Sequence, residues 1–153
     1  MKLALIICTV VFIVSIIAFA LLAMQSRVGR APGLGGMSIE ACGPQPNCVS
    51  SFALSSSAHY VDGFTVSADG QDEAWNDLIV VVKGAGGNVE KNAYPYLSAT
   101  FSSKVFGFVD DFECLLDIDA GVIHVRSGSR VGYSDGNVNR ARVEHIRGML
   151  NKQ

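Results

Sequence analysis

The stretch VFGFVDDFECLLDIDAGVIHVRSGSR, residues 105–130, decides the fold because apolar and acidic side chains alternate along it before the chain reverses. Successive side chains of a β-strand point to opposite faces, so Phe112 and Leu116 share one face, while Asp111 and Glu113 share the other. The sequence DAG is typical of a hairpin turn, and an apolar returning segment follows it. We therefore predict an antiparallel β-hairpin over most of this stretch.

One acid breaks the pattern, because the same period of two places Asp110 on the apolar face, toward the predicted core. A buried carboxylate is costly unless it is paired or accepts several hydrogen bonds. Two arginines lie on or just after the returning strand, near the register that brings them opposite the acids. The expected partners are Asp110, Asp111 and Glu113 on one strand, and Arg126 and Arg130 on the other. Two interpretations stay open: a structural network of ion pairs, or a functional site built from acids and arginines.

Three further elements follow from the patterns around this hairpin. Residues 71–83 combine acids in the first turn, an apolar stripe and a final lysine before a glycine, which predicts a helix. Residues 94–103 alternate as a strand, and residues 137–150 carry the apolar stripe of an amphipathic helix. Together these elements predict an α+β fold: an antiparallel sheet of about four strands with flanking helices, preceded by a single N-terminal transmembrane helix.

The predicted transmembrane helix comes from an uncharged run between Leu3 and Met24. At about 1.5 Å per helical residue, this run spans roughly 33 Å, which matches the hydrocarbon core of a bilayer. We predict a transmembrane anchor over residues 1–25, a flexible glycine-rich linker over 26–38 and one globular domain over 39–153. A cleaved signal peptide is the alternative interpretation of the apolar run.

Two cysteines, Cys42 and Cys48, flank a short loop that contains two prolines. Their spacing is wider than the CxxC of zinc and redox sites, and no second cluster of cysteine and histidine follows, so we expect no metal site. We predict a disulfide, with two unpaired thiols as the alternative. Because disulfides persist in oxidising compartments, the bond favours an exported domain.

Charge is unevenly distributed along the globular part. Residues 62–119 hold eleven acidic residues against three lysines, whereas residues 126–153 hold six basic residues against two acidic ones. One interpretation is pairing between the two parts, and the other is a basic segment that faces lipid headgroups or another anionic ligand. We expect no nucleic-acid partner, because the net charge is −2 and the chain has no dense basic run.

Four motifs in order carry a resemblance to a known family: PNCVSS (46–51), FGFVDDFE (106–113), RSGSRVGYSD (126–135) and NRARVEHIR (139–147). With them, about residues 41–150 resemble the family called domain of unknown function 1499 (DUF1499), which occurs in bacteria and in plant plastids. The family has no established activity, and its bacterial members often carry an apolar N-terminal segment. Together with the predicted anchor and disulfide, this resemblance leads us to expect the bacterial inner membrane, with the globular domain on the periplasmic side.

The resemblance also implies a set of site residues. The chain departs from the usual family pattern at Phe112 and Cys114, which puts in doubt a shared role for the Cys114 thiol. The binding candidates are Asn47, Ser50, Ser51, Asp110, Asp111, Glu113, Arg126, Ser127, Ser129, Arg130, Ser134, Asp135, Asn139 and Arg142, and the disulfide candidates are Cys42 and Cys48.

The chemistry of these candidates narrows the function. His59 and His124 lie outside the four motifs, and His145 lies in the one motif that contains no cysteine or serine, which disfavours a cysteine or serine nucleophile with a histidine base. We expect no cofactor and prefer a binding or accessory domain anchored in the membrane, with an envelope protein or an anionic ligand as its partner. The alternative is a small hydrolase-like enzyme that uses an acid–arginine site. An open cleft between the acids and the arginines would favour such a site, and a closed, fully paired network would favour a structural role.

Overall fold

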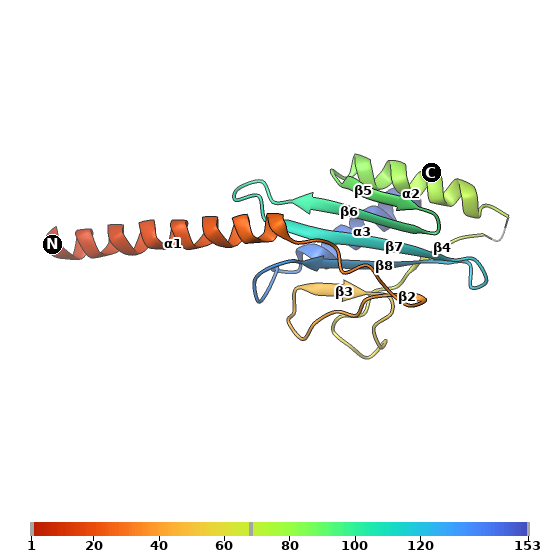
Figure 1. Cartoon of the computed structure of the whole chain (residues 1–153), viewed down its shortest axis with the longest axis horizontal. Coiled ribbons are helices and arrows are strands. Elements are labelled where there is room, and N and C mark those ends of the chain that lie inside the picture. Colours follow the sequence, from red (N-terminus) through yellow and green to blue (C-terminus); the bar gives the residue numbers. More distant parts are fainter. Residues whose placement is uncertain (1, 68, 153) are drawn as a thin grey trace.

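The computed structural model describes residues 2–67 and 69–152. Most of their strands form one main sheet, which helices adjoin (Figure 1). Helix α1 (Lys2–Val28) projects from one end of this sheet. Helices α2 (Gln71–Gly84) and α3 (Val138–Leu150) cover one of its faces. The α+β class is confirmed, as are the long apolar N-terminal helix and the two further helices.

The main sheet is antiparallel and contains six strands. We predicted about four strands, which is too few. The strands that the sequence did not indicate are short or polar, and an exposed polar edge strand has no apolar alternation to detect. Five strands lie in the order β3 (Cys48–Ser50), β8 (Val122–Ser129), β7 (Val109–Asp117), β6 (Tyr96–Ser102) and β5 (Asn88–Ala93), and β4 (Phe64–Thr65) also pairs with β8.

The hydrophobic core lies between the sheet and its two helices. The predicted hairpin forms as β7 and β8, and its apolar face supplies Phe112 and Cys114 to the core. Leu78 of α2 and Val143 and Ile146 of α3 pack against this face, and all three are fully buried. Each large side chain removed from water in this way contributes about 1.5–3 kcal/mol. The core therefore fixes which side chains of β7 point toward the helices and which point away.

The opposite face of the sheet is covered by the segment after α1, residues 29–40, which we call the crossing segment (Figure 1). It contains a small hairpin of β1 (Leu34–Gly35) and β2 (Ser38–Ile39), and Ile39 is only 2% exposed. The backbone N–H of Gly33 donates to Glu113 of β7. This segment includes most of the predicted linker, residues 26–38, and the structure gives it specific contacts with the sheet. Glycines that interrupt the apolar period do not prevent such contacts.

Helix α1 is long and apolar enough to cross a membrane, a property that signal sequences share. Most of its side chains face away from the rest of the protein, but its last turns contact the sheet. Ala23 and Ser26 are buried there, and Ser26 Oγ accepts a hydrogen bond of 3.0 Å from the backbone N–H of Val109. The apolar helix and the globular part therefore meet at the start of β7.

Candidate functional site

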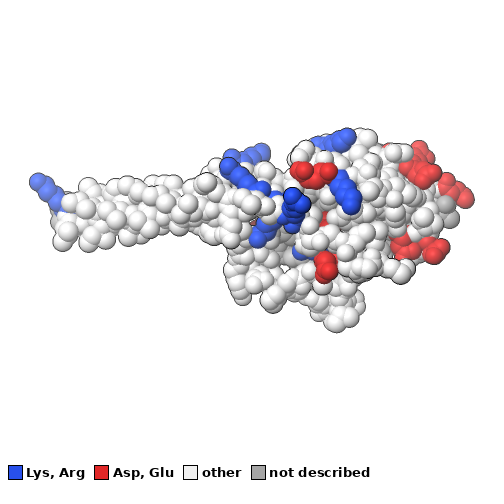
Figure 2. All heavy atoms as spheres, in the orientation of Figure 1, with Lys and Arg blue, Asp and Glu red and all other residues white. Residues whose placement is uncertain are grey.

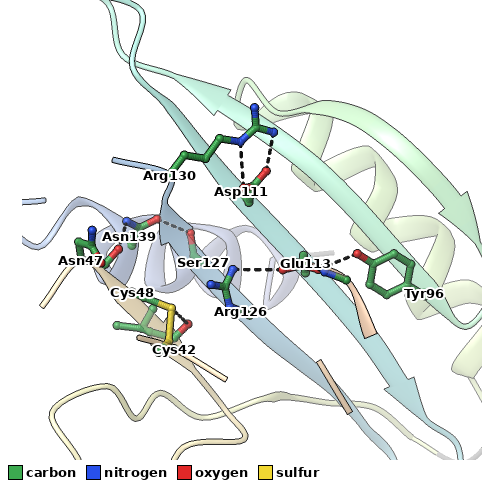
Figure 3. Close-up of polar contacts among 12 residues, drawn as sticks. Cys42, Asn47, Cys48, Tyr96, Asp111, Glu113, Arg126, Ser127, Arg130 and Asn139 are labelled. Atoms are coloured by element: carbon green, nitrogen blue, oxygen red, sulfur yellow. Dashed lines mark hydrogen bonds and ion pairs between the residues drawn. A yellow bond between two sulfur atoms is a disulfide. The ribbon is translucent and has the colours of Figure 1, made fainter. Parts of the chain in front are cut away.

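Most of the predicted site residues belong to two polar networks on opposite faces of the sheet. The Glu113 network comprises Tyr96, Asp111, Glu113, Arg126 and Arg130 and lies under the crossing segment (Figure 3). The Asn139 network lies between the sheet and α3. Its members are Asp110, Ser127, Ser129, Asp135, Asn139 and Arg142.

Glu113 is the centre of the first network and is fully buried. Its Oε1 accepts from the backbone N–H of Gly33 at 2.8 Å and from the hydroxyl of Tyr96 at 2.7 Å. Its Oε2 accepts from Arg126 Nη1 at 3.1 Å. Burial raises the pKa of Glu113 above its usual value, while these three donors oppose the shift. Both carboxylate oxygens are therefore engaged by groups of the protein itself.

Strand register explains why Glu113 and Arg126 meet. The two residues are direct partners in the antiparallel pairing of β7 with β8, so both side chains point to the same face. Arg126 is only 8% exposed, and its Nε has no hydrogen-bond partner among the described residues. Tyr96 belongs to the neighbouring β6, and sequence reasoning assigned it no role. The alternation of Tyr96 with Ser98 and Thr100 along the predicted strand could have indicated that Tyr96 lies on the same face of the sheet as Glu113.

A second pair in this network connects the sheet to the end of α1. Arg130 donates from Nε and Nη2 to the two carboxylate oxygens of Asp111 at 2.9 and 2.7 Å. This two-point contact raises the pKa of Arg130 above its usual value. Arg130 Nη1 also donates to the backbone carbonyl of Ser26 at 3.0 Å. The predicted pairing of Asp111 and Glu113 with the two arginines is therefore present.

Asp110 is the exception, and its predicted pairing with Arg126 or Arg130 is wrong. The side chain does lie on the helix-facing side of the sheet, as the period of two predicts. Its partner there is Arg142 of α3, with Nη2 at 2.6 Å from Asp110 Oδ2. Helix packing supplies this partner, because the arginines of β8 and of the turn after it point to the other face.

Asn139 joins this pair to the disulfide loop and is fully buried. Its Oδ1 accepts from Ser127 Oγ at 2.7 Å and also from Arg142. Its Nδ2 lies within hydrogen-bond distance of three acceptors, which belong to β8, to the loop before α3 and to the residue that precedes β3. These acceptors are Ser129 Oγ, Asp135 Oδ2 and the backbone carbonyl of Asn47, at 3.0, 2.8 and 3.0 Å.

The disulfide loop is held against the end of β8. Cys42 and Cys48 form the predicted disulfide, with a Cα–Cα separation of 5.7 Å (Figure 3). The side chain of Asn47 donates to the carbonyl of Gly132 at 2.7 Å, and its backbone carbonyl accepts from Ser129 N–H at 2.9 Å. The bond, together with the apolar helix, points to a location outside the cytoplasm.

The disulfide leads to a thiol-counting prediction. In the denatured, unreduced full-length protein we expect two thiols to react, Cys8 and Cys114, and four to react after reduction. Before denaturation Cys114 should stay unmodified, because it is fully buried and burial raises the pKa of its thiol well above the usual value. Mass spectrometry after alkylation gives the counts. Four reactive thiols without a reductant would contradict the disulfide.

Three candidates lie outside both networks, two of them near β3. Ser50 is buried, and its Oγ accepts from the N–H of Phe52 at 3.2 Å. Ser51 Oγ lies 3.0 Å from His124 Nδ1, a contact that the sequence did not indicate. The same oxygen accepts from a backbone N–H of β8, and the ring of Phe52 stacks on His124 at 4.0 Å. Ser134 lies in the loop before α3, apart from them. The serine and histidine therefore stabilise the packing of β3.

A groove of about 760 Å³ opens beside the Glu113 network, between residues 27–34 and strands β5 and β6. We call it the Arg30 groove. Arg27, Arg30 and Lys91 line it, and within the part of the chain that the structure describes none of the three forms an ion pair. Glu90 also lines the groove and accepts from a neighbouring threonine. Sequence reasoning missed these three cations, because Arg27 and Arg30 belong to the predicted linker and Lys91 to an undetected edge strand, although the candidates Asp111 and Arg130 also line the groove.

Residues 2–67 and 69–152 contain no group of three or more His, Cys, Asp or Glu side chains that could bind a metal ion. Among curated proteins the chain has no match. Among protein families, residues 38–150 match the family described as "Protein of unknown function (DUF1499)". This range includes the four motifs of the sequence analysis, so the resemblance is confirmed. The chain belongs to the DUF1499 family.

Proposed function

We propose that this protein is a binding domain anchored in the bacterial inner membrane, with its globular part on the periplasmic side and an anionic ligand in the Arg30 groove. Helix α1 supports the anchor, and the disulfide supports the oxidising compartment. A ligand that carries a phosphate group suits this groove, because guanidinium and ammonium groups bind phosphate oxygens well.

The observation that carries this proposal is the charge of the groove. Arg27 is held in place by the carbonyl groups of Phe106 and Gly107, and these contacts leave its positive charge uncompensated. Arg30 makes no side-chain hydrogen bond within residues 2–67 and 69–152. The ammonium group of Lys91 lies 5.4 Å from the ring centre of Tyr96, which positions it at the wall of the groove. Three cations thus face a space large enough for a small ligand.

The alternative, a hydrolase-like enzyme with an acid–arginine site, has less support. A general acid or base must reach the substrate by a direct hydrogen bond or through one water molecule. Glu113 is fully buried, and both of its oxygens already accept hydrogen bonds. Asp111 is 3% exposed and engaged at both oxygens by Arg130. The acids and arginines therefore form a closed network, which favours a structural role for them.

The groove leads to a binding prediction for Arg30 and Lys91. The full-length protein in phosphatidylcholine nanodiscs is titrated with inorganic phosphate and with glycerol phosphate by calorimetry. A parallel sample in discs that contain phosphatidylglycerol is examined by native mass spectrometry for retained lipid. We expect Arg30→Ala and Lys91→Ala each to weaken binding about fivefold, since one exposed charge contact contributes up to about 1 kcal/mol. Lys83→Ala, an exposed lysine of α2, is the matched control and should bind normally.

The two samples separate the sources of the ligand. Binding of the free phosphates indicates a soluble ligand, whereas retention of phosphatidylglycerol alone indicates a lipid headgroup. Equal binding by the Arg30, Lys91 and Lys83 variants would place the anion elsewhere and contradict the proposal. So would the absence of binding in both samples.

A further inference from the structure

The loop between β6 and β7, residues 103–108, lies against the apolar helix and holds a fixed position there. The ring of Phe106 stacks on Phe19 of α1 with ring centres 5.6 Å apart, and the ring of Phe108 meets Phe19 edge-on at 6.4 Å. Arg27 Nη2 donates to the carbonyl of Phe106 at 2.9 Å. Gly107 has φ of 70° and lies so close to the Arg27 guanidinium that a side chain there would collide with it. The loop is therefore attached to α1 on two sides.

The position of Phe19 sets the depth of this loop in a membrane. Phe19 lies inside the uncharged run that ends at Met24, five residues later. At about 1.5 Å per residue, the ring contacts lie roughly 7 Å inside the end of the apolar run. When α1 spans a bilayer, its partner loop must therefore lie within the boundary between headgroups and acyl chains.

Several exposed side chains at this end of the domain are apolar or aromatic. Val105 is 85% exposed, and in the neighbouring loop between β8 and α3 Tyr133 is 75% exposed. Val138, at the start of α3, is 49% exposed. Between the two loops and α1 lies a cavity of about 280 Å³, lined on its apolar side by Phe19, Leu22, Phe108, Val109, Val131 and Val138. Part of this wall comes from the apolar helix itself, so the apolar side of the cavity lies at the depth of lipid. The other side is polar and is lined by Ser103, Asp110, Ser129, Ser134 and Asp135.

Charged side chains are also unevenly distributed between the end of the domain at α1 and the opposite end. Figure 2 shows lysine and arginine gathered where α1 joins the globular part, and aspartate and glutamate gathered at the far end. Arg27 lies in the last turn of α1, Arg30 follows the helix, and Lys104 belongs to the β6–β7 loop. The acids Asp117 and Asp119 lie at the other end of β7, where Gln71 at the start of α2 reaches the carbonyl of Ile118. A surface of anionic phospholipids attracts the basic end and repels the acidic end.

We propose that the β6–β7 loop and the β8–α3 loop form a membrane-docking surface whose occupant is the phospholipid of the bilayer. Val105, Phe106 and Tyr133 enter the interface, and an acyl chain fills the cavity beside Phe19. Interfacial segments of proteins bury their apolar face about 5–10 Å deep, which agrees with the depth set by Phe19. This inference rests on the proposed anchor and adds a second region of contact between the domain and the bilayer.

The test places a tryptophan at three positions of the full-length protein in proteoliposomes whose lipids carry bromine on the acyl chains. Val105→Trp reports the docking loop, and Phe12→Trp in the middle of α1 reports the anchor. Ile118→Trp is the matched control, because Ile118 is an apolar residue, 51% exposed, at the opposite end of β7 about 30 Å away. The wild-type protein gives the background, since its one tryptophan, Trp75, is buried.

Bromine quenches tryptophan only at close contact. At the interfacial depth of about 5–10 Å, we expect Val105→Trp to lose about half of its emission or more and Ile118→Trp to lose almost none. Quenching of Phe12→Trp without quenching of Val105→Trp would overturn the docking surface and leave the anchor intact. Loss of quenching at both positions would overturn the anchor as well. Emission from Val105→Trp that is shifted to the blue but not quenched would indicate a protein occupant and contradict the proposal.

Discussion

Replacing Arg126 with alanine should lower the free energy of unfolding by about 3–5 kcal/mol, because it leaves a buried carboxylate without its counter-charge. Glu113 would keep only the N–H of Gly33 and the hydroxyl of Tyr96 as donors. Urea denaturation of the full-length protein in detergent micelles, followed by Trp75 fluorescence, measures the change. An unchanged denaturation midpoint would contradict the closed network.

The loss of unfolding free energy in Arg126→Ala should also increase as the pH rises. The pKa of Glu113 is raised in the folded protein by burial, and removal of Arg126 raises it further. A carboxyl group whose pKa is higher in the folded than in the unfolded state keeps its proton to a higher pH in the native protein. Its contribution to stability is present at low pH and is lost as the pH rises through the folded pKa. The deficit of Arg126→Ala should therefore be small near pH 4 and largest at neutral pH.

The control for this variant is Glu144→Ala. Glu144 pairs with Arg147 one turn away on α3, and its side chain is 52% exposed. Exposed pairs of this kind contribute less than about 1 kcal/mol. A loss in Glu144→Ala as large as that in Arg126→Ala would show that burial does not determine the cost.

Replacing Asn139 with alanine should cost about 3 kcal/mol, which makes it the second large effect. The side chain is fully buried, and its amide connects α3 to β8 and to the disulfide loop. Its removal takes one hydrogen-bond partner from each of several polar groups, among them Ser127 Oγ, Ser129 Oγ and the carbonyl of Asn47, and a lost partner at a buried group costs about 1–3 kcal/mol. Because the carbonyl of Asn47 loses one of its two donors, hydrogen exchange at the N–H of Ser129 should become faster.

The matched control is Asn151→Ala, at the residue that follows the same helix. The side chain of Asn151 is exposed and makes no hydrogen bond within residues 2–67 and 69–152. Exposed substitutions of this kind change stability by less than about 0.5 kcal/mol. Similar losses in the two asparagine variants would contradict a specific role for the buried amide.

Within the hairpin, the sequence was sufficient to predict both the strands and one network. Period two predicted the faces of β7, and the nearby turn predicted that Arg126 and Arg130 lie near the acids of β7, whereas the direct pairing of Glu113 with Arg126 comes from the structure. Asp110 was also placed on the correct face. Its partner Arg142 lies on a separate helix, and the packing of helix on sheet has no signal in local periodicity.

On the face of the sheet under the crossing segment, local sequence patterns did not predict which residues are buried. Alternating acids on β7 indicate a face in water, yet Asp111 is 3% exposed and Glu113 is fully buried. The residues that cover them come from a glycine-rich segment without apolar period, so its contacts depend on the completed sheet. The Arg30 groove was missed for the same reason, because two of its walls are this segment and the polar strand β5.

The contact between Gly33 and Glu113 has a consequence for how this domain meets its ligand. A flexible tether of thirteen residues would let the domain search a radius of about 20 Å around the end of its anchor. In the anchored protein that we propose, the attached crossing segment would remove that search and hold the groove at one height above the lipid. Encounter would then depend on lateral diffusion in the plane of the membrane instead of the swing of a tether, and only ligands presented at that height would be captured.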